Sequence, residues 1–343
     1  MIRVATAVAL LTCLPASRAQ SGASNSLPHF AVIGIDGLSV DGVRNTRSPR
    51  LHKFMGIAAW TLEARAVMPT LSSPNWESII TGSAPEQHGI TSNGYLKDKI
   101  ELRPVCIDAA GKYPTIFQIL REQRPASRIS VFHDWPGFAD LLEKSAPDVL
   151  QHESGPKKTV EAALRDWNEN HPNLLFVHLD NVDHAGHEYG WGTREYYHAV
   201  EDADTDLGPL LDALLATPDT YVLITSDHGG KGRNHGGNTL GEIQIPWMLA
   251  GPGVEAGRMT APVNTFDSGA TIAWIFGLTM PNCWIARPAL AAFRPETVAA
   301  HAPHPDPRRD SVGTCAPEAP AAGVRANGNG AVPHLVFEGK GHQ

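Results

Sequence analysis

The stretch LLFVHLDNVDHAGH, residues 174–187, joins an apolar run to a cluster of carboxylates and imidazoles. Its first half, Leu174–Leu179, is typical of a short strand that is buried on both faces. Its second half holds two aspartate/histidine pairs at a spacing of four, Asp180 with His184 and Asp183 with His187. Residues four apart share one side of a helix, so either pair could face a single cation. The stretch therefore predicts a strand that leads into a metal-binding helix.

Four more apolar runs have the character of buried parallel strands: Phe30–Ile35, Ile129–Phe132, Tyr221–Thr225 and Ile245–Ala250. Helices are expected between the runs, at Tyr113–Arg121, Thr159–Trp167 and Glu195–Leu215. Strands that alternate with helices indicate a layered α/β/α fold, in which helices cover both faces of a mostly parallel central sheet.

Two other predicted strands also run into residues that can bind a metal. Phe30–Ile35 is followed by Asp36, and Tyr221–Thr225 is followed by SDHGG (226–230) and then NHGG (234–237). Sites in open parallel sheets form beyond the carboxyl ends of the strands. We therefore expect one Asp/His pair from residues 180–187 to meet Asp36, Asp227, His228 and His235. One zinc ion needs three or four protein ligands, whereas this set suits two cations about 3.5–4 Å apart.

The segment PTLSSPNWESIITG, residues 69–82, carries the candidate nucleophile. Three hydroxyls, those of Thr70, Ser72 and Ser73, precede a Pro-Asn pair and a short helical run that stops at Gly82. A capped helix N-terminus would use the same residue types. The segment alone does not distinguish a helix cap from a nucleophile.

Five motifs occur in an order and context that resemble the alkaline phosphatase superfamily, most closely its type I phosphodiesterase/nucleotide pyrophosphatase branch: GIDG, PTLSSPNWESIITGSAPEQHGI, DHAGHEYG, SDHGG and NHGG. The resemblance covers about residues 29–294. It implies an alkaline-phosphatase-like fold and a two-metal hydrolase of phosphate esters, with phosphodiesters or nucleotide pyrophosphates as small-molecule substrates. It also implies a covalent intermediate on the nucleophilic serine.

The resemblance implies roles for individual residues. Ser72 would be the nucleophile, Asn75 would face the phosphoryl group, and Thr70 would shape the loop. One metal would be held by Asp36, Ser72, Asp227 and His228, and the other by Asp183, His187 and His235. The pair Asp180/His184 is thereby disfavoured. Mixed histidine and carboxylate ligation favours Zn²⁺ as the divalent ion, without excluding manganese, iron or cobalt.

The chain departs from the family pattern at two positions. Many nucleotide pyrophosphatases have threonine where this chain has Ser72, a change that keeps the hydroxyl. They often have histidine where this chain has Trp76, to which we assign no catalytic role.

Three other functions stay open as alternatives. A phosphomonoesterase of the alkaline phosphatase type would use the same ligands, but it typically adds cationic side chains over the phosphoryl group, and no Lys/Arg motif here can be assigned to that role. A sulfatase would match Ser72 and Pro74, but its pattern requires an arginine where this chain has Trp76. A non-enzymatic exported binding protein would require the complete ligand set to be vestigial.

The first 19 residues, MIRVATAVALLTCLPASRA, are typical of a secretory signal peptide. The apolar run is too short for a permanent membrane span, and no other segment approaches one. We therefore expect an exported protein, periplasmic or secreted. A catalytic domain is predicted at 28–294, followed by an irregular tail rich in proline, alanine and glycine at 295–343.

Composition excludes some partners and leaves the disulfide pairing open. The 343 residues are 42% hydrophobic and 19% charged, with a net charge of -8 and no dense basic patch, so nucleic acids are not expected as partners beyond nucleotides as substrates. The cysteines outside the signal sequence are Cys106, Cys283 and Cys315. A Cys283–Cys315 bridge is one pairing that the sequence allows. The oligomeric state is not indicated by these residues.

Overall fold

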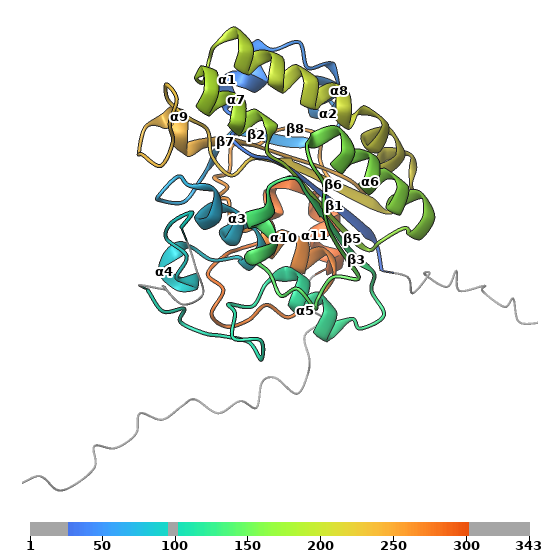
Figure 1. Ribbon diagram of the computed structural model, residues 1–343. Coiled ribbons are helices and arrows are strands. Elements are labelled where there is room, and N and C mark those ends of the chain that lie inside the picture. Colours follow the sequence, from blue (N-terminus) through green and yellow to red (C-terminus); the bar gives the residue numbers. More distant parts are fainter. Residues whose placement is uncertain (1–26, 95–101, 302–343) are drawn as a thin grey trace, which may run out of the picture. The chain divides into compact units, whose positions relative to one another are not determined.

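A computed structural model of the chain describes residues 27–94 and 102–301 (Figure 1). The predicted signal peptide, Cys315 and most of the predicted tail lie outside the described residues. The start of that tail, residues 295–301, is a helix, α11 (Pro295–His301), and not irregular chain. Within the described part of the chain, no helix is long and apolar enough to cross a membrane.

An eight-stranded sheet forms the centre of the described chain, in the order β4-β3-β5-β1-β6-β7-β2-β8. The parallel strands are β4 (Val149–His152), β3 (Ile129–His133), β5 (Leu174–Leu179), β1 (His29–Ile35) and β6 (Thr220–Thr225). The rest of the sheet is formed by β7 (Gln244–Ala250), β2 (Ala59–Arg65) and β8 (Gly257–Arg258). This architecture confirms the predicted mostly parallel sheet.

Helices cover both faces of the sheet (Figure 1). One face is covered by α1 (Val40–Asn45), α2 (Pro49–Met55), α6 (Pro156–Asn170) and α8 (Arg194–Ala216). The other face packs against α3 (Ser72–Thr81), α5 (Ile116–Gln123) and α10 (Asp267–Ile275). Strand β1 serves both cores, because Phe30 and Val32 point to one face and Ala31 and Ile33 to the other. The shorter elements are α4 (Pro85–His88), α7 (Asn181–Tyr189), α9 (Leu240–Ile243) and the 3₁₀ turns Pro136–Asp140 and Leu290–Ala292.

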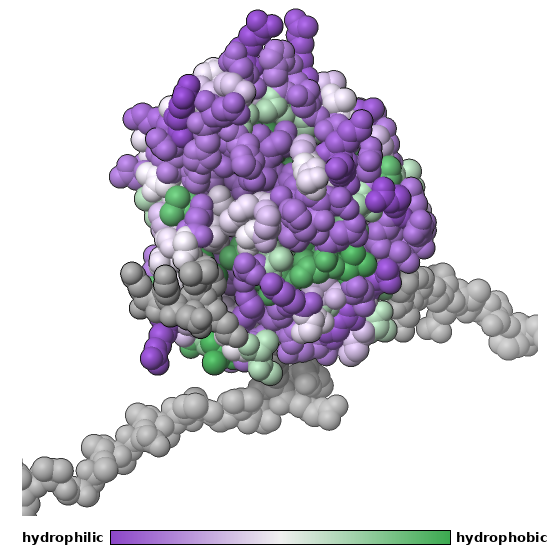
Figure 2. All heavy atoms as spheres, in the orientation of Figure 1, coloured by the Kyte–Doolittle hydropathy of each residue, from purple (hydrophilic) through white to green (hydrophobic). Residues whose placement is uncertain are grey.

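The two cores take up most of the large apolar side chains of the described residues. On the face drawn in Figure 2, hydrophilic residues predominate, and apolar residues reach the surface in a short band and in small separate areas. The helices that the sequence predicts near 113–121, 159–167 and 195–215 are confirmed as α5, α6 and α8, with ends shifted by a few residues. The start of α5 moves to Ile116 because the Thr115 side chain accepts a hydrogen bond from the Gln118 N–H and caps the helix.

The prediction that Ile245–Ala250 is a parallel strand is wrong. Strand β7 contains these residues but runs antiparallel to both β6 and β2. A parallel return needs a long crossover connection, usually a full helix. Residues 226–243 contain only the four-residue helix α9, so the chain turns back beside β6 instead.

The pairing of cysteines also differs from the bridge considered from the sequence. Cys283 bonds to Cys106, with the two Cα atoms 6.4 Å apart. The pairing Cys283–Cys315 is therefore corrected to Cys106–Cys283, a link between residues 177 positions apart. Sequence could not indicate this pair, because only the fold brings the segment before α5 beside the segment after α10.

Candidate active site

Three neighbouring parallel strands deliver three aspartates to one edge of the sheet. Asp36 directly follows β1, Asp227 follows β6 by two residues, and Asp183 lies in α7, which follows β5. Because β1 lies between β5 and β6, the carboxyl ends of the three strands are adjacent. All three carboxylates are buried.

The carboxylates and histidines form two donor groups, each with ligand atoms within 4.8 Å of one another. In the first group, Asp183 Oδ2 lies 3.3 Å from His187 Nε2, and Asp183 Oδ1 lies 3.6 Å from His235 Nε2. The second group contains Asp36, Asp183 and His228. Asp183 thus belongs to both groups, whereas the resemblance assigned it to one metal alone.

Asp227 lies beside the second group. Its Oδ2 is 3.2 Å from His228 Nε2, and the same nitrogen is 3.4 Å from Asp36 Oδ1. The opposite oxygen, Asp227 Oδ1, accepts a hydrogen bond from the Gly37 N–H at 3.2 Å. The structure therefore brings together the six side chains expected to bind metal, with Asp183 between the two groups.

Each aspartate keeps one buried oxygen without a hydrogen-bond partner among the described residues: Asp36 Oδ1, Asp183 Oδ1 and Asp227 Oδ2. A buried carboxylate oxygen without a partner costs free energy. Divalent cations beside these oxygens would remove that cost. The donor set of carboxylates and imidazoles thus fits a pair of divalent cations.

Burial and neighbouring charges shift the pKa values of several proposed ligands. Burial and then the neighbouring Asp227 raise the pKa of Asp36 well above its ordinary value. Burial and then Asp183 raise the pKa of Asp227 to about 8. Burial and the adjacent His228 lower the pKa of His235 to about 4, so its ring is neutral at pH 7, and its Nε2 lies 3.1 Å from His187 Nε2. A cation bound at these carboxylates would displace their protons, so its affinity should rise with pH.

Ser72 is the first residue of α3, and its side chain lies over these ligands. Its Oγ is 3.2 Å from His228 Nε2, and the residue is 6% exposed. The N-terminus of a helix favours an anion there, because its backbone N–H groups are free and its dipole is positive. The hydroxyl is thus beside the ligands and at a position suited to bind a phosphoryl oxygen.

Thr70 ties the loop before Ser72 to the loop that carries His235. Its Oγ1 donates to the Gly237 carbonyl at 2.7 Å and accepts from the Gly236 N–H at 3.0 Å. His235 Nδ1 is 2.8 Å from the Thr70 carbonyl, which leaves Nε2 turned toward Asp183. Such partners of the outer nitrogen orient a metal-binding imidazole.

The structure corrects the role expected for Asn75. This side chain is fully buried, and its amide binds backbone groups of the preceding loop. Oδ1 accepts from the Val67 N–H at 2.7 Å, and Nδ2 donates to the carbonyls of Pro69 at 3.1 Å and Leu71 at 2.9 Å. Asn75 therefore shapes the loop before Ser72 and does not face the position of a phosphoryl group.

Asn93 is a site residue that the sequence did not single out. Its Oδ1 accepts a hydrogen bond of 2.9 Å from the Ser73 N–H, which places the amide at the start of α3. In the described part of the chain its NH₂ group makes no hydrogen bond. No local pattern marks it, because GITSNGY reads as an ordinary polar loop.

Trp191 backs the histidines of the first donor group. Its ring centroid lies 5.4 Å from that of His187 and 5.9 Å from that of His235. A Cβ on Gly186 or Gly230 would come within 2.5 Å and 2.1 Å of the indole, so these two glycines make the slot that holds it. The glycines of DHAGH and SDHGG are visible in the sequence, but only the fold shows that they make room for the Trp191 ring.

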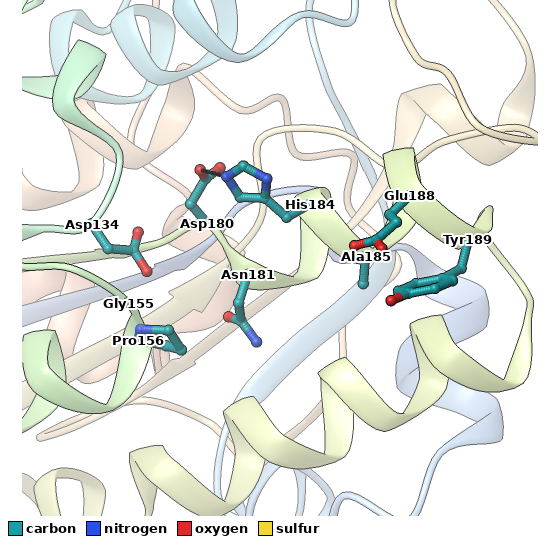
Figure 3. A pocket seen from close by; sticks show the side chains of 9 residues that line it. All are labelled: Asp134, Gly155, Pro156, Asp180, Asn181, His184, Ala185, Glu188 and Tyr189. Atoms are coloured by element: carbon teal, nitrogen blue, oxygen red, sulfur yellow. Dashed lines mark ion pairs between the residues drawn. The ribbon is translucent and has the colours of Figure 1, made fainter.

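The alternative pair Asp180/His184 lies on another side of α7. Asp180 Oδ2 and His184 Nε2 are 2.9 Å apart, and both residues line a cavity of about 290 Å³ together with Asp134, Asn181 and Glu188 (Figure 3). Asp183 and His187 instead meet His235. The two pairs that spacing alone could not separate are thus distinguished by the rotation of α7.

The family of the chain follows from a comparison with known proteins. Residues 30–239, more than half of the chain, match the family model described as type I phosphodiesterase / nucleotide pyrophosphatase. The chain belongs to this family.

Curated relatives in the type I phosphodiesterase family are distant. Bovine (Bos taurus) bis(5'-adenosyl)-triphosphatase ENPP4 is 27% identical over 224 residues, which is 61% of this chain and 49% of the relative. Ectonucleotide pyrophosphatase/phosphodiesterase family member 1 of Mus musculus is 24% identical over 239 residues, 64% of this chain and 26% of the relative. The chain thus spans about half or less of the length of these relatives.

Solved structures show that this phosphodiesterase family member has the alkaline-phosphatase-like fold. Murine ectonucleotide pyrophosphatase/phosphodiesterase 5, an inactive variant in complex with AMP, has a TM-score of 0.62 at 16% identity, over 75% of this chain and 96% of that one. Alkaline phosphatase PafA has a TM-score of 0.66 at 10% identity, over 79% and 100%. A 2-O GAG sulfatase has a TM-score of 0.63 at 15% identity, over 78% and 74%. At these identities the likeness establishes the fold alone.

Proposed function

We propose that this protein hydrolyses phosphate esters, with phosphodiesters or nucleotide pyrophosphates as substrates and Ser72 as the nucleophile. The observation that carries the proposal is a set of three buried carboxylate oxygens without hydrogen-bond partners among the described residues. They lie in a cluster with three imidazoles, one of which, His228, is 3.2 Å from the Ser72 hydroxyl. The family supports the same chemistry, since its members include enzymes named as pyrophosphatases and phosphodiesterases.

Two divalent cations, with zinc favoured, would be held by the residues of the two donor groups and by Ser72 and Asp227. When bound, they would lower the pKa of the Ser72 hydroxyl and neutralise charge on the phosphoryl group. Asp183, His187 and His235 are proposed for one cation, and Asp36, Asp227, His228 and Ser72 for the other. The position of Asp183 in both donor groups suggests that it orients the two halves of the site together.

The residues of the chain supply the covalent steps. Ser72 Oγ loses its proton and attacks phosphorus, the bond from phosphorus to the leaving oxygen breaks, and the alcohol or nucleotide leaves with one proton, so that no net proton is lost. Asn93 would donate its NH₂ group to a phosphoryl oxygen during this step. A water molecule then attacks the phosphoserine, its oxygen stays on phosphorus, and the Ser72 hydroxyl is restored. The sum is one ester bond cleaved for one water consumed.

A diester substrate is favoured over a monoester. A monoester near neutral pH carries close to two negative charges on three oxygens, and monoesterases of this superfamily typically add cationic side chains there. Among the described residues, no lysine or arginine side chain hydrogen-bonds or ion-pairs with a residue of the two donor groups or with Ser72. A diester carries a single charge, so the cations and Asn93 would suffice.

The proposal is tested by comparing four substrates on one preparation: an aryl phosphomonoester, the matching phosphodiester, a dinucleotide pyrophosphate and an aryl sulfate. Elemental analysis of the same sample should find close to two transition-metal ions per chain. We expect the highest kcat/KM for the diester or the pyrophosphate. Faster cleavage of the sulfate, or full activity without any bound metal, would overturn the proposal.

The nucleophile is tested with Ser72→Ala, for which we expect loss of nearly all turnover with the fold and metal content retained. Ser72→Thr should keep measurable activity, because it keeps the hydroxyl. Ser73→Ala is the matched control, since it removes a hydroxyl one position away. If Ser73→Ala were inactive and Ser72→Ala active, the assignment would be wrong by one residue.

We further propose that the protein is exported and that residues 28–294 form its catalytic domain. The signal-peptide pattern at 1–19 supports export, and the Cys106–Cys283 bond fits an oxidising compartment. N-terminal sequencing of protein recovered outside the cytoplasm should begin at Gln20. Retention of the first 19 residues in the mature protein would contradict this assignment.

A further inference from the structure

The two oxygens of Asp36 have different surroundings. Oδ2 accepts a hydrogen bond of 2.8 Å from the Trp76 indole Nε1–H, and His178 Nε2 lies 3.2 Å from the same oxygen. Oδ1 has no hydrogen-bond partner among the described residues and lies 3.4 Å from His228 Nε2. Two nitrogens thus hold one oxygen of the carboxylate, and the other oxygen faces the candidate metal ligands.

We infer that Trp76 and His178 are positioning residues that fix Asp36 for metal binding, and that Trp76 also couples the helix of the nucleophile to the metal site. The inference rests on the proposed function in one respect, because it takes Asp36 to be a metal ligand.

The coupling follows from helix geometry. Ser72 and Trp76 are four residues apart in α3, so their side chains leave the helix on the same side. The indole of Trp76 binds Asp36, and the Ser72 hydroxyl lies 3.2 Å from His228. One helical turn therefore contacts both Asp36 and His228, and the hydrogen bond of Trp76 sets the rotation at which Ser72 reaches the site.

The indole is held in this orientation by its surroundings. A Cβ at position 34 would come within 2.4 Å of the ring, so Gly34, two residues before Asp36, leaves the space that the ring fills. Trp76 is fully buried, and its ring meets the His178 ring edge-on at 4.7 Å between centroids. The N–H therefore stays directed at Asp36.

His178 is positioned by the pairing of its strand. Strands β1 and β5 pair Gly34 with His178, which sets the imidazole beside the indole. Its Nδ1 lies 3.6 Å from Asp134 Oδ1, and Asp134 lines the cavity shown in Figure 3. The imidazole thus lies between two carboxylates, but among the described residues it is within hydrogen-bond distance of a carboxylate only at Asp36, the proposed ligand.

Trp247 provides a matched control within the same protein. It is also fully buried, and its indole N–H donates to a side-chain oxygen, Ser268 Oγ, at 3.1 Å. Replacement of either tryptophan by phenylalanine removes a similar volume and one hydrogen bond. Only Trp76→Phe removes a hydrogen bond to a proposed metal ligand.

The first test measures zinc affinity by competition with a chelator. Loss of a residue that orients a metal ligand typically weakens binding by about 10- to 100-fold. We expect Trp76→Phe to lose about 10-fold or more at one of the two sites, and Trp247→Phe to keep both affinities. The visible spectrum of the Co²⁺-loaded protein should also change in Trp76→Phe and stay unchanged in Trp247→Phe, since it reports the geometry of the ligands.

The second test uses His178. If Trp76→Phe does not fold, this test still shows whether Asp36 is oriented by its hydrogen-bond partners. His178→Gln keeps an N–H donor near Asp36, whereas His178→Phe has none. We expect the glutamine variant to retain more of the zinc affinity than the phenylalanine variant.

The possible outcomes separate this inference from the proposed function. A wild-type protein that binds no divalent cation would remove the proposed function, and the inference with it. A wild-type protein with two sites, together with equal zinc affinities in Trp76→Phe and Trp247→Phe, would overturn the inference and leave the proposed function intact. Equal zinc affinities in His178→Gln and His178→Phe would overturn the positioning role of His178 and leave the proposed function intact.

Discussion

Two asparagines near the nucleophile differ in what their amides contact. Asn75 is buried and binds only backbone groups of residues 67–71, whereas Asn93 lies at the surface and binds the Ser73 N–H. The resemblance to the family implied that the first would face the phosphoryl group beside the nucleophile. Closeness in sequence does not report where a helical side chain points, and Asn75 points back at its own loop.

The two asparagines should therefore respond differently to replacement by alanine. Asn93→Ala should lower kcat/KM by about 100-fold, in the range seen when one donor to a developing charge is removed, and should cost about 1 kcal/mol of stability through the lost hydrogen bond to the Ser73 N–H. Asn75→Ala should lower the free energy of unfolding by about 1–3 kcal/mol, because it leaves buried backbone groups without partners. Kinetics and urea unfolding of both variants check this. A stable Asn75→Ala variant with lowered kcat/KM would return the phosphoryl-facing role to Asn75.

Glu143 is a buried carboxyl group far from the candidate ligands in sequence. It is 1% exposed, and the Thr115 N–H donates to its Oε1 at 3.2 Å. Burial raises its pKa to about 7 from an ordinary value of 4.5, against the hydrogen bonds from Thr115. The folded protein thus holds a proton on Glu143 over a pH range in which the unfolded chain has lost it.

This shift has a defined sign for stability. Because the folded pKa is the higher one, the contribution of Glu143 is fully present below about pH 4.5 and is lost as pH rises toward 7. Glu143→Gln should remove this loss, so its melting temperature should fall less than that of the wild type between pH 5 and pH 7.5. Glu161→Gln, at an exposed position, should follow the wild type. Parallel pH profiles for wild type and Glu143→Gln would refute the assignment.

At the scale of elements, the runs most readily predicted were those buried on both faces of the sheet. Strands β1, β3, β5 and β6 are almost entirely buried, so continuous apolar sequence marks them. Strand β2 was not predicted, because AWTLEAR carries Glu63 and Arg65 at exposed positions near the edge of the sheet. The direction of β7 could not be predicted either. It depends on the path of residues 226–243 between β6 and β7, and the sequence does not show that path.

The candidate site could be predicted for the same reason as the inner strands. Each of its aspartates follows an apolar run, and parallel strands bring their ends together. The positioning contacts could not be predicted. Trp76, His178 and Trp191 look like ordinary core residues in the sequence. No motif marks them, and the partners of their polar atoms come from elements that are distant in the sequence.

The end of α3 depends on a glycine. Gly82 has φ of 57° and ψ of 30°, and its N–H donates to the Ser78 carbonyl. A Cβ at this position would also come within 2.4 Å of the Trp284 ring. Gly82 is therefore required both by backbone conformation and by close approach.

Gly82→Ala should destabilise the protein by more than the left-handed backbone alone accounts for, which is about 1 kcal/mol. Gly111→Ala is the matched control, because Gly111 also has a positive φ, of 77°, and no atom lies within 4 Å of its added Cβ. Chemical unfolding of both variants gives the difference, which measures the Trp284 contact. Equal losses of stability would show that the ring moves aside freely.

At the scale of the whole described chain, the Cys106–Cys283 bond joins two segments that are 177 positions apart. A bond that closes so long a loop restricts the unfolded chain strongly, and loss of a native disulfide typically costs about 2–5 kcal/mol. We expect the double variant Cys106→Ser/Cys283→Ser to unfold at a lower urea concentration than the oxidised wild type. The reduced wild type should match the double variant. Peptide mapping that pairs Cys283 with Cys315 instead would contradict the structure.

The three aspartates at the ends of β1, β6 and β5 also bear on how long the protein survives. Two of them lie in residues 180–189 and 226–239, and without cations burial and neighbouring carboxylates disfavour the charged forms of Asp36 and Asp227. Metal that binds only the folded state stabilises that state by mass action. We therefore expect chelation to shorten the lifetime of the protein against proteases, with the first cuts in the glycine-rich segment 229–237. In surroundings poor in metal the protein would then be inactive and also degraded. The supply of metal ions would govern both the amount of protein and its rate of hydrolysis.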